Sequence, residues 1–156
     1  MTRSLAVRFV RETDVAEVLS LVRDTLAEFG LQFGQGSSTD EELTRLPGSY
    51  EQAGGAFWVA CDGPRLLGTC GVFLVEQGTF ELRKMYLRPD ARGLGLGKRL
   101  LDESVAWTRA NGGRRMVLDT TEQMTRAIRF YEANGFVRDD AQIHDGRCTR
   151  GYRRDL

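Results

Sequence analysis

The sequence has 156 residues, 41% of them hydrophobic, which is enough for one ordinary domain with a sizeable core. Lysine and arginine total 22, as do aspartate and glutamate, so the formal net charge is zero and the chain lacks the basic character of a general nucleic-acid binder. No apolar run approaches the ~18 residues that a membrane span needs. The N-terminal residues also lack the continuous apolar stretch of a signal peptide.

Three cysteines, Cys61, Cys70 and Cys148, are widely spaced and contain no CxxC pair. An odd number at such spacing favours neither a disulfide framework nor a zinc site, so no metal is predicted. We therefore expect a protein of the reducing cytoplasm.

The first third of the chain predicts a strand, a helix and a loop. Leu5, Val7 and Phe9 alternate with other residues, which indicates a half-buried strand. Apolar residues then recur at three- and four-residue spacings over 15–29, which predicts a helix that ends at Gly30. Residues 30–55 are rich in Gly, Ser and Gln; we expect at most a short helix around 39–46, close to the substrate entrance.

Residues 56–87 predict three consecutive antiparallel strands, separated by the turns "DGPR" and "EQGT". Further along the chain we expect a helix over about 95–111, a strand over 114–120, a helix over 124–135 and a closing hairpin of 136–143 with 147–156. This order predicts one α/β domain, residues 1–156, with a single mixed sheet and helices on its faces.

The stretch "RGLGLGK", from Arg92 to Lys98, carries three glycines between a predicted strand and a predicted helix. Such a junction suits an anion, because free N–H groups and the helix dipole point at one spot. A Walker A loop does not fit, since Arg92 stands at its first glycine and Arg99 at its Ser/Thr. A dinucleotide fingerprint does not fit either, because Lys98 stands at its third glycine.

A third pattern does fit: [R/Q]xxGxG, with Arg92, Gly95 and Gly97. It resembles the pyrophosphate-binding motif of the GNAT superfamily of acetyl-CoA-dependent N-acetyltransferases. The resemblance continues, in the family's order, through "ELRKMYL", "LLDESVAW", "MVLDT" and "AIRFYEANGF". It implies a mixed, mostly antiparallel sheet that splays between the strands of 80–87 and 114–120, with helices on both faces.

The resemblance also implies how acetyl-CoA, as co-substrate, is held. Backbone groups of three residues would pair with the pantetheine amides like a short added strand: Met85, Tyr86 and Leu87. Backbone amides of the glycine stretch would surround the pyrophosphate: Arg92, Gly93, Leu94, Gly95, Leu96, Gly97 and Lys98.

One position departs from the family pattern. Families of this type often carry an asparagine that contacts pantetheine seven residues before the tyrosine of "FYEANGF", and here that position is Met124. The hydrogen bond is therefore missing or comes from Thr120, Thr121 or Thr125. Thr125 is included in the predicted coenzyme site.

Three residues are candidates for proton transfer. Tyr131 matches the family's tyrosine that protonates the departing thiolate, although its spacing also suits a core tyrosine. Glu81 is the preferred general base, and Asp119 is the second candidate. Each carboxylate could instead be a solvated strand-end charge or a partner of Arg83 or Lys84, and water could handle the proton.

Three nearby residues have simpler interpretations. Arg83 shares the strand face of Glu81 and could hold a substrate carboxylate. His144, the single histidine, is expected in a surface turn. Cys70 and Cys148 are expected in strands, as small core side chains.

The resemblance thus implies an N-acetyltransferase that moves an acetyl group from acetyl-CoA directly to a primary amine. The alternative is a non-catalytic acyl-CoA-binding module of the same fold. The expected partner is a small-molecule amine, slightly favoured, or a peptide amine such as a protein N-terminus. Neither nucleic acid nor a membrane is expected, and a homodimer is left open.

Overall fold

The computed structural model describes residues 3–156. Its strands form one seven-stranded sheet in the order β1-β2-β3-β4-β5-β7-β6. Neighbouring strands are antiparallel except β4 and β5, which are parallel. The strands are β1 (Leu5–Phe9), β2 (Ala56–Asp62), β3 (Arg65–Glu76), β4 (Thr79–Leu87), β5 (Arg115–Thr120), β6 (Val137–Arg138) and β7 (Arg150–Asp155). The predicted mixed, mostly antiparallel sheet is confirmed.

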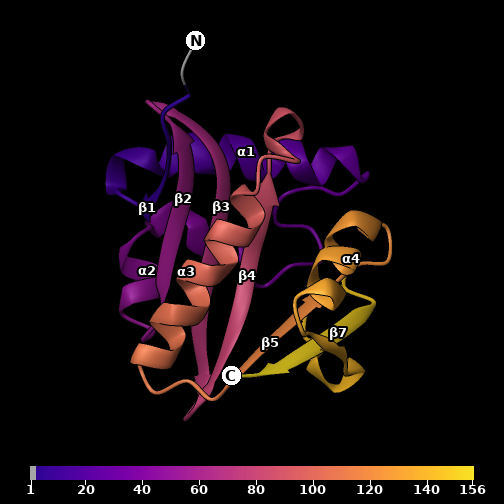
Figure 1. Ribbon diagram of the computed structural model, residues 1–156. Helices are drawn as coiled ribbons and strands as arrows, with labels where there is room; N and C mark the ends of the chain where they lie inside the picture. The colour runs from indigo at the N-terminus through magenta and orange to yellow at the C-terminus, as the bar shows by residue number, and fades with distance from the viewer. Residues whose placement is uncertain (1–2) are drawn as a thin grey trace.

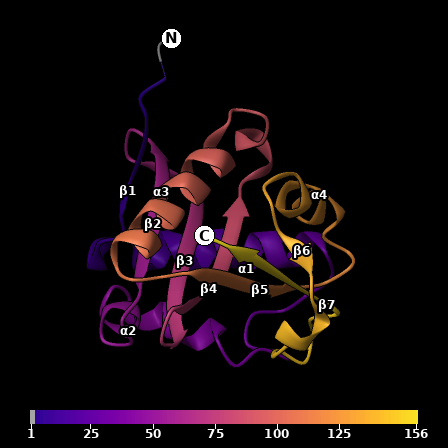
Figure 2. The same ribbon diagram turned by 60° about the horizontal axis from the view of Figure 1, so that its bottom comes forward.

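Helices cover both faces of this sheet, as expected. They are α1 (Val15–Glu28), α2 (Gly48–Glu51), α3 (Leu96–Ala110) and α4 (Thr125–Ala133), with short 3-10 turns at Asp40–Arg45 and elsewhere. In Figure 1, α3 lies in front of the strands β2–β4, while α1 and α2 lie behind them. Figure 2 shows α3 and α4 above the strands and α2 below. Within residues 3–156, no helix is both long and apolar enough to cross a membrane.

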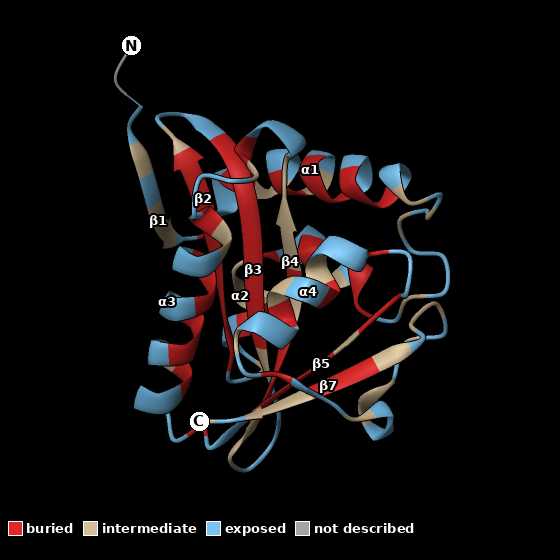
Figure 3. Ribbon diagram, turned by 45° about the vertical axis from the view of Figure 1, so that its right-hand side comes forward, coloured by how far each residue is buried: buried red, intermediate tan, exposed pale blue. Residues whose placement is uncertain are grey.

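A hydrophobic core lies on each face of the sheet, and strand β2 contributes side chains to both. All its residues up to Cys61 are buried, and they alternate between the two faces. Trp58 and its even-numbered neighbours pack with α3 and α4, whereas Phe57 and its odd-numbered neighbours pack with α1 and α2. A strand buried on both faces has a continuous apolar sequence, which is what "AFWVAC" shows. Figure 3 shows the same arrangement, with the sheet-facing sides of α1 and α3 buried.

The sheet splays between β4 and β5. Their pairing covers only Thr79 to Glu81 opposite Arg115 to Val117, and beyond it the two strands diverge (Figure 1). Just past that point β4 carries a bulge, where the register with β3 shifts and Lys84 takes a left-handed φ of 55°. A bulge adds local twist and bends the strand away from its neighbour. The resulting opening lies where the resemblance places it.

The closing hairpin is shorter than the sequence predicts. Strand β7 pairs along six residues with β5, but β6 has only two residues. Between them, Asp139 accepts a hydrogen bond from the amide of Ala141, and Asp140 accepts one from the amide of Gly151. These side chains satisfy backbone donors locally, so the chain turns where the sequence pattern suggested a longer strand.

Candidate active site

The opening between β4 and β5 contains two adjoining hollows. The first, which we call the glycine groove, has a volume of about 490 Å³ and is lined by Met85–Leu87, Arg92–Gly93, Gly95–Lys98, the start of α4 and part of α1. The second, the charged pocket, is narrower, about 60 Å³, and is lined mainly by Glu81–Tyr86, Asp119–Thr121 and residues of the loop before β7. Four residues line both: Met85, Tyr86, Met124 and Tyr131.

The glycines give the groove its shape. Gly93 and Gly95 have left-handed φ values of 83° and 78°, which L side chains rarely adopt, and a Cβ on either would meet no protein atom within 4 Å. Both therefore leave open space in front of backbone amides at the start of α3, where Gly95 is the N-cap. Free amides, a helix N-terminus and absent side chains suit a phosphate group.

The side chains of the other motif residues differ in their contacts and in whether they line the groove. Arg92 lines the groove, but its guanidinium donates to Glu28 at 3.0 and 3.1 Å and to the carbonyl of Leu87. Its side chain thus fastens α1 to the loop. Leu94 is 39% exposed and lies outside the groove wall, while Lys98 lines it and pairs with Asp102 at 2.5 Å.

The strand edge and the threonines complete the groove. Because β4 has lost β5 as a neighbour beyond Glu81, the edge at Met85–Leu87 faces the groove. The hydroxyl of Thr120 donates to the sulfur of Met124, and that of Thr121 contacts Gln123. Thr125, which is exposed at the start of α4, lines the groove. Of the three threonines, Thr125 best fits the predicted role.

Tyr131 stands where the two hollows meet. It lies on α4 and is 7% exposed, with its ring against Phe136 and Tyr152. Burial raises the pKa of its phenol far above the ordinary value, so the hydroxyl is protonated at neutral pH. Within residues 3–156 this hydroxyl makes no protein hydrogen bond. The ring therefore packs in the core, while the role of the hydroxyl as proton donor stays a prediction.

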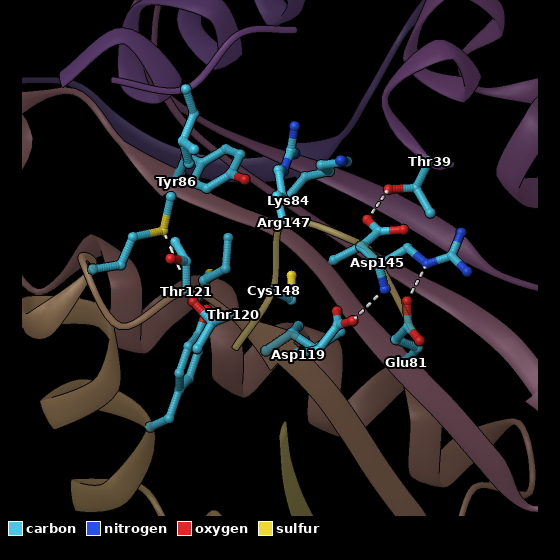
Figure 4. Close-up of a pocket in the computed structure, with 16 residues that line it drawn as sticks. Thr39, Glu81, Lys84, Tyr86, Asp119, Thr120, Thr121, Asp145, Arg147 and Cys148 are labelled. Carbon is cyan, nitrogen blue, oxygen red and sulfur yellow. Dashed lines mark hydrogen bonds and ion pairs between the residues drawn. The ribbon is translucent and has the colours of Figure 1, made fainter. Parts of the chain in front are cut away.

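The two predicted carboxylates both line the charged pocket (Figure 4). Glu81 is 5% exposed and accepts a hydrogen bond from Nε of Arg83 at 2.6 Å. Burial raises the pKa of Glu81, Arg83 opposes this shift, and the charge of Asp119 adds to it. Asp119 accepts hydrogen bonds from the amides of His144, at 2.7 Å, and Asp145, at 3.0 Å. The two carboxylates are thus close enough to influence each other.

A buried ion-pair cluster, which the sequence did not reveal, closes the pocket. Asp40 is fully buried and is bound by Lys84 and, at 2.8 and 2.9 Å, by Arg147. Burial opposes ionisation of Asp40, but the hydrogen bonds from Arg147 and the charge of Lys84 outweigh it and hold its pKa well below the ordinary value. This cluster ties the 30–47 segment to β4 and to the loop before β7.

Arg83 already pairs with two carboxylates of the protein. Besides Glu81, it donates to Glu42 at 2.9 Å, and its guanidinium lies 3.9 Å from the ring centre of Phe73. A substrate carboxylate, the ligand that the sequence suggested for it, would compete with these contacts.

The structure confirms two of the predictions for single cysteine and histidine residues and contradicts a third. Cys70 is buried in β3 and His144 is exposed in a loop, as predicted. Cys148 is not in a strand; it lies in the loop before β7 and lines the charged pocket, because β7 begins only at Arg150. Burial raises the pKa of its thiol to about 12, so it is neutral at neutral pH. In residues 3–156, no group of three or more His, Cys, Asp or Glu could hold a metal ion.

Comparisons with known proteins agree with this geometry. The Acetyltransferase (GNAT) family matches residues 20–136. The chain is 34% identical over 131 residues to an uncharacterized N-acetyltransferase of Escherichia coli, YjgM, covering 81% of this chain and 78% of that protein. It is 31% identical over 134 residues to an uncharacterized N-acetyltransferase of Schizosaccharomyces pombe, covering 85% and 82%. The chain therefore belongs to the GNAT acetyltransferase family.

A solved structure from the same family also has this fold. The crystal structure of a GNAT-family acetyltransferase from Staphylococcus aureus superposes with a TM-score of 0.89 over 98% of this chain and 99% of that one, at 22% identity. The predicted fold class is thus confirmed.

Proposed function

We propose that this chain transfers an acetyl group from acetyl-CoA directly to a primary amine. The observation that carries the proposal is the meeting of the glycine groove and the charged pocket at Tyr131. A non-catalytic coenzyme-binding module would need the groove alone. Here the groove continues into a pocket with hydrogen-bonded carboxylates, one buried and one half-buried, which is what an acceptor amine and its proton require.

The residues present fit acetyl-CoA. Amides from Gly93 to Lys98 would hold the pyrophosphate, the edge at Met85–Leu87 would pair with the pantetheine amides, and the Thr125 hydroxyl would replace the missing asparagine. A protein from Thermoplasma acidophilum, crystallised in complex with coenzyme A, has the same fold, with a TM-score of 0.77 over 98% of this chain and 99% of that one, at 20% identity. When bound, the coenzyme supplies an activated acetyl thioester.

Glu81 and Tyr131 then carry out the proton transfers of the reaction. Glu81, through water, takes a proton from the ammonium group, so that the neutral nitrogen forms the new C–N bond. The nitrogen still carries one proton more than the amide product. As the C–S bond breaks, Tyr131 gives its hydroxyl proton to the sulfur and regains a proton from the nitrogen through water. The raised pKa of Glu81 brings its proton affinity closer to the working pH, which suits a base. Asp119, held by two backbone amides, is the alternative base.

Several broader features belong to the same proposal. We infer that the described chain acts as one domain and, since all three cysteines are free thiols, that it works in the reducing cytoplasm. The acceptor is an amine of low molecular weight or a peptide amine, and a homodimer remains a prediction. A relative from Stenotrophomonas maltophilia is an aminoglycoside acetyltransferase, 30% identical over 78% of this chain and 85% of that protein.

A thermal-shift assay and a thiol-release assay test the function together. Acetyl-CoA at ~100 times its dissociation constant is expected to stabilise the fold by about 2.7 kcal/mol, and NAD and ATP at equal concentration by less. Thiol release is then measured with a panel of amines, amino acids and peptides. Stabilisation without release from any amine would support the binding module, and the absence of both would refute the proposal.

A further inference from the structure

The cations that line the charged pocket are all paired with carboxylates of the protein. Arg83 pairs with Glu81 and Glu42, while Lys84 and Arg147 both pair with Asp40. All three cationic side chains are buried or nearly so, with at most 14% of the side chain exposed. Recruiting one of them to a carboxylate or phosphate of the acceptor would strand a buried anion, which is costly. The pocket is therefore poorly suited to an anionic acceptor.

Two carboxylates at the same end of the pocket have no cation partner within residues 3–156. Asp119 accepts hydrogen bonds from two backbone amides, and Asp145 accepts them from the amide and hydroxyl of Ser38, at 3.2 and 2.8 Å. These donors are neutral, so they fix the carboxylates in place without cancelling their charge. Burial opposes ionisation of Asp145, but the Ser38 hydrogen bonds, together with the charges of Lys84 and Arg147, outweigh it and keep its pKa below the ordinary value. Figure 4 shows Glu81, Asp119 and Asp145 gathered at one end of the pocket.

Counting charged groups shows how far negative charge exceeds positive charge in the pocket. The pocket and its paired neighbours contain five carboxylates, at Asp40, Glu42, Glu81, Asp119 and Asp145, against three cations, so two negative charges remain. An acceptor with a single ammonium group would balance one of them. An acceptor with a second positive charge would balance both.

The shape of the pocket limits the acceptor further. Its volume is about 60 Å³, which favours a small acceptor over a bulky one. Tyr131 lines it where the groove begins, and Cys148 lies beside Asp119 (Figure 4). A linear molecule could therefore present one amine at Tyr131 while its other end lies among the acidic side chains.

We propose, on the basis of the acetyl transfer proposed above, that the acceptor is a slender aliphatic diamine whose second ammonium group binds at Asp119 and Asp145. Asp145 is the main determinant of this specificity, because it takes no part in the proton transfers proposed above. Asp119 then serves as a ligand of the second ammonium, and Glu81 remains the base.

Three acceptors of equal chain length test the inference on the unaltered protein. They are diaminobutane with an amine at each end, butylamine and γ-aminobutyrate, which differ in carrying a positive, a neutral or a negative far end. The diamine is expected to have a kcat/KM about tenfold or more above that of butylamine, the usual size of a charge-assisted contact, and γ-aminobutyrate the lowest value. Equal or better turnover of butylamine or γ-aminobutyrate would overturn the inference.

A pair of variants identifies the carboxylate. In Asp145→Asn the ratio of kcat/KM for diamine over butylamine is expected to fall towards one. Asp155→Asn removes the same charge from an exposed position on β7, outside the pocket, and is expected to keep the full ratio. An undiminished ratio in a folded Asp145→Asn protein would remove Asp145 from the site. If that variant does not fold, the three-acceptor comparison on the unaltered protein still decides the substrate class.

The same assays separate this inference from the proposed function. If acetyl-CoA stabilises the chain and another primary amine releases thiol faster than diaminobutane does, the diamine inference is wrong and the acetyl transfer stands. If acetyl-CoA neither binds nor releases thiol with any amine, both are wrong.

Discussion

The glycine groove and the charged pocket adjoin, yet they are built in opposite ways. The groove is formed largely by backbone and apolar groups from two stretches, 85–98 and 124–131, with α1 as a wall. The pocket is formed by charged side chains from the 30–47 segment, β4, β5 and the loop before β7. The centre of the groove is thus one continuous stretch, 85–98, which suits a ligand shared by a family. The pocket depends on long-range ion pairs, and such pairs can differ from one relative to the next.

Tyr131→Phe probes the point where the two regions meet and should have the largest effect. Loss of a general acid typically lowers the rate by about 10²–10⁴-fold, and phenylalanine preserves the packing of the ring. We expect kcat to fall by this amount, while acetyl-CoA binding, measured by calorimetry, stays nearly the same.

Tyr152→Phe is the matched control, because Tyr152 is a neighbouring buried tyrosine whose hydroxyl donates to Glu132 outside both hollows. It should leave kcat close to the original value. Equal losses of turnover and coenzyme affinity in Tyr131→Phe would make Tyr131 a packing residue only.

Asp40→Asn should break the charged pocket and spare the glycine groove. The change leaves two buried cations, Lys84 and Arg147, without their anion. Removing one partner of a buried ion pair costs about 3–5 kcal/mol, which urea unfolding can measure. We expect acetyl-CoA affinity in the folded fraction to remain, and KM for the amine to rise.

The dependence of the free energy of unfolding on pH, in the acidic range, gives a second test of Asp40. Its pKa is lower in the folded protein than in the unfolded chain, so its contribution is complete above the ordinary value of 3.8 and is lost as the pH falls toward the folded value. In Asp40→Asn this part of the acid dependence should disappear. An acid-unfolding curve identical to that of the original protein would contradict the role given to the cluster.

Glu81→Gln tests which carboxylate of the pocket is the base. Glutamine keeps the shape but cannot take the proton, so kcat/KM at neutral pH should fall by about 10²-fold and the acidic limb of its pH profile should vanish. Raising the pH should restore part of the activity, since more of the amine is then neutral.

Asp119→Asn is the comparison for this variant. It should keep the acidic limb and lose part of the preference for the diamine. The reverse pattern, with the limb lost only in Asp119→Asn, would assign the base to Asp119.

Gly95→Val should weaken the binding of acetyl-CoA in the groove, and we place this effect last. A side chain at this position would project into the open space expected to hold the phosphates. Most of the ~2.7 kcal/mol of stabilisation by saturating acetyl-CoA should be lost in a thermal-shift assay.

Gly112→Val controls for backbone strain. Gly112 has a similar φ of 84°, also has no protein atom near its missing Cβ, and lies beyond the other end of α3. It should unfold at a lower temperature yet keep the full shift with acetyl-CoA. The same loss of shift in both variants would mean that strain, and not the position in the groove, causes it.

The sequence by itself determined the elements and the groove. Period-two alternation in β1 and three- and four-residue spacing in α1 and α3 depend on neighbours in the chain, so both could be identified without coordinates. The glycine motif is local as well: its left-handed residues and the helix start lie within seven positions, Arg92 to Lys98. Their chemical meaning follows from the residue types themselves.

Only the tertiary structure decided the charged pocket. Asp40 meets Lys84, 44 positions away, and Arg147, 107 positions away, and no periodicity links residues at such separations. The bulge at Lys84 was equally hidden, because a lysine gives no sign of a left-handed φ. Arg83, which seemed available to a substrate from its strand face, is occupied by Glu42 from a distant segment. Whether a charge is free or neutralised depends on the partner that folding brings to it, and that partner sets the sign of the molecule the pocket can accept.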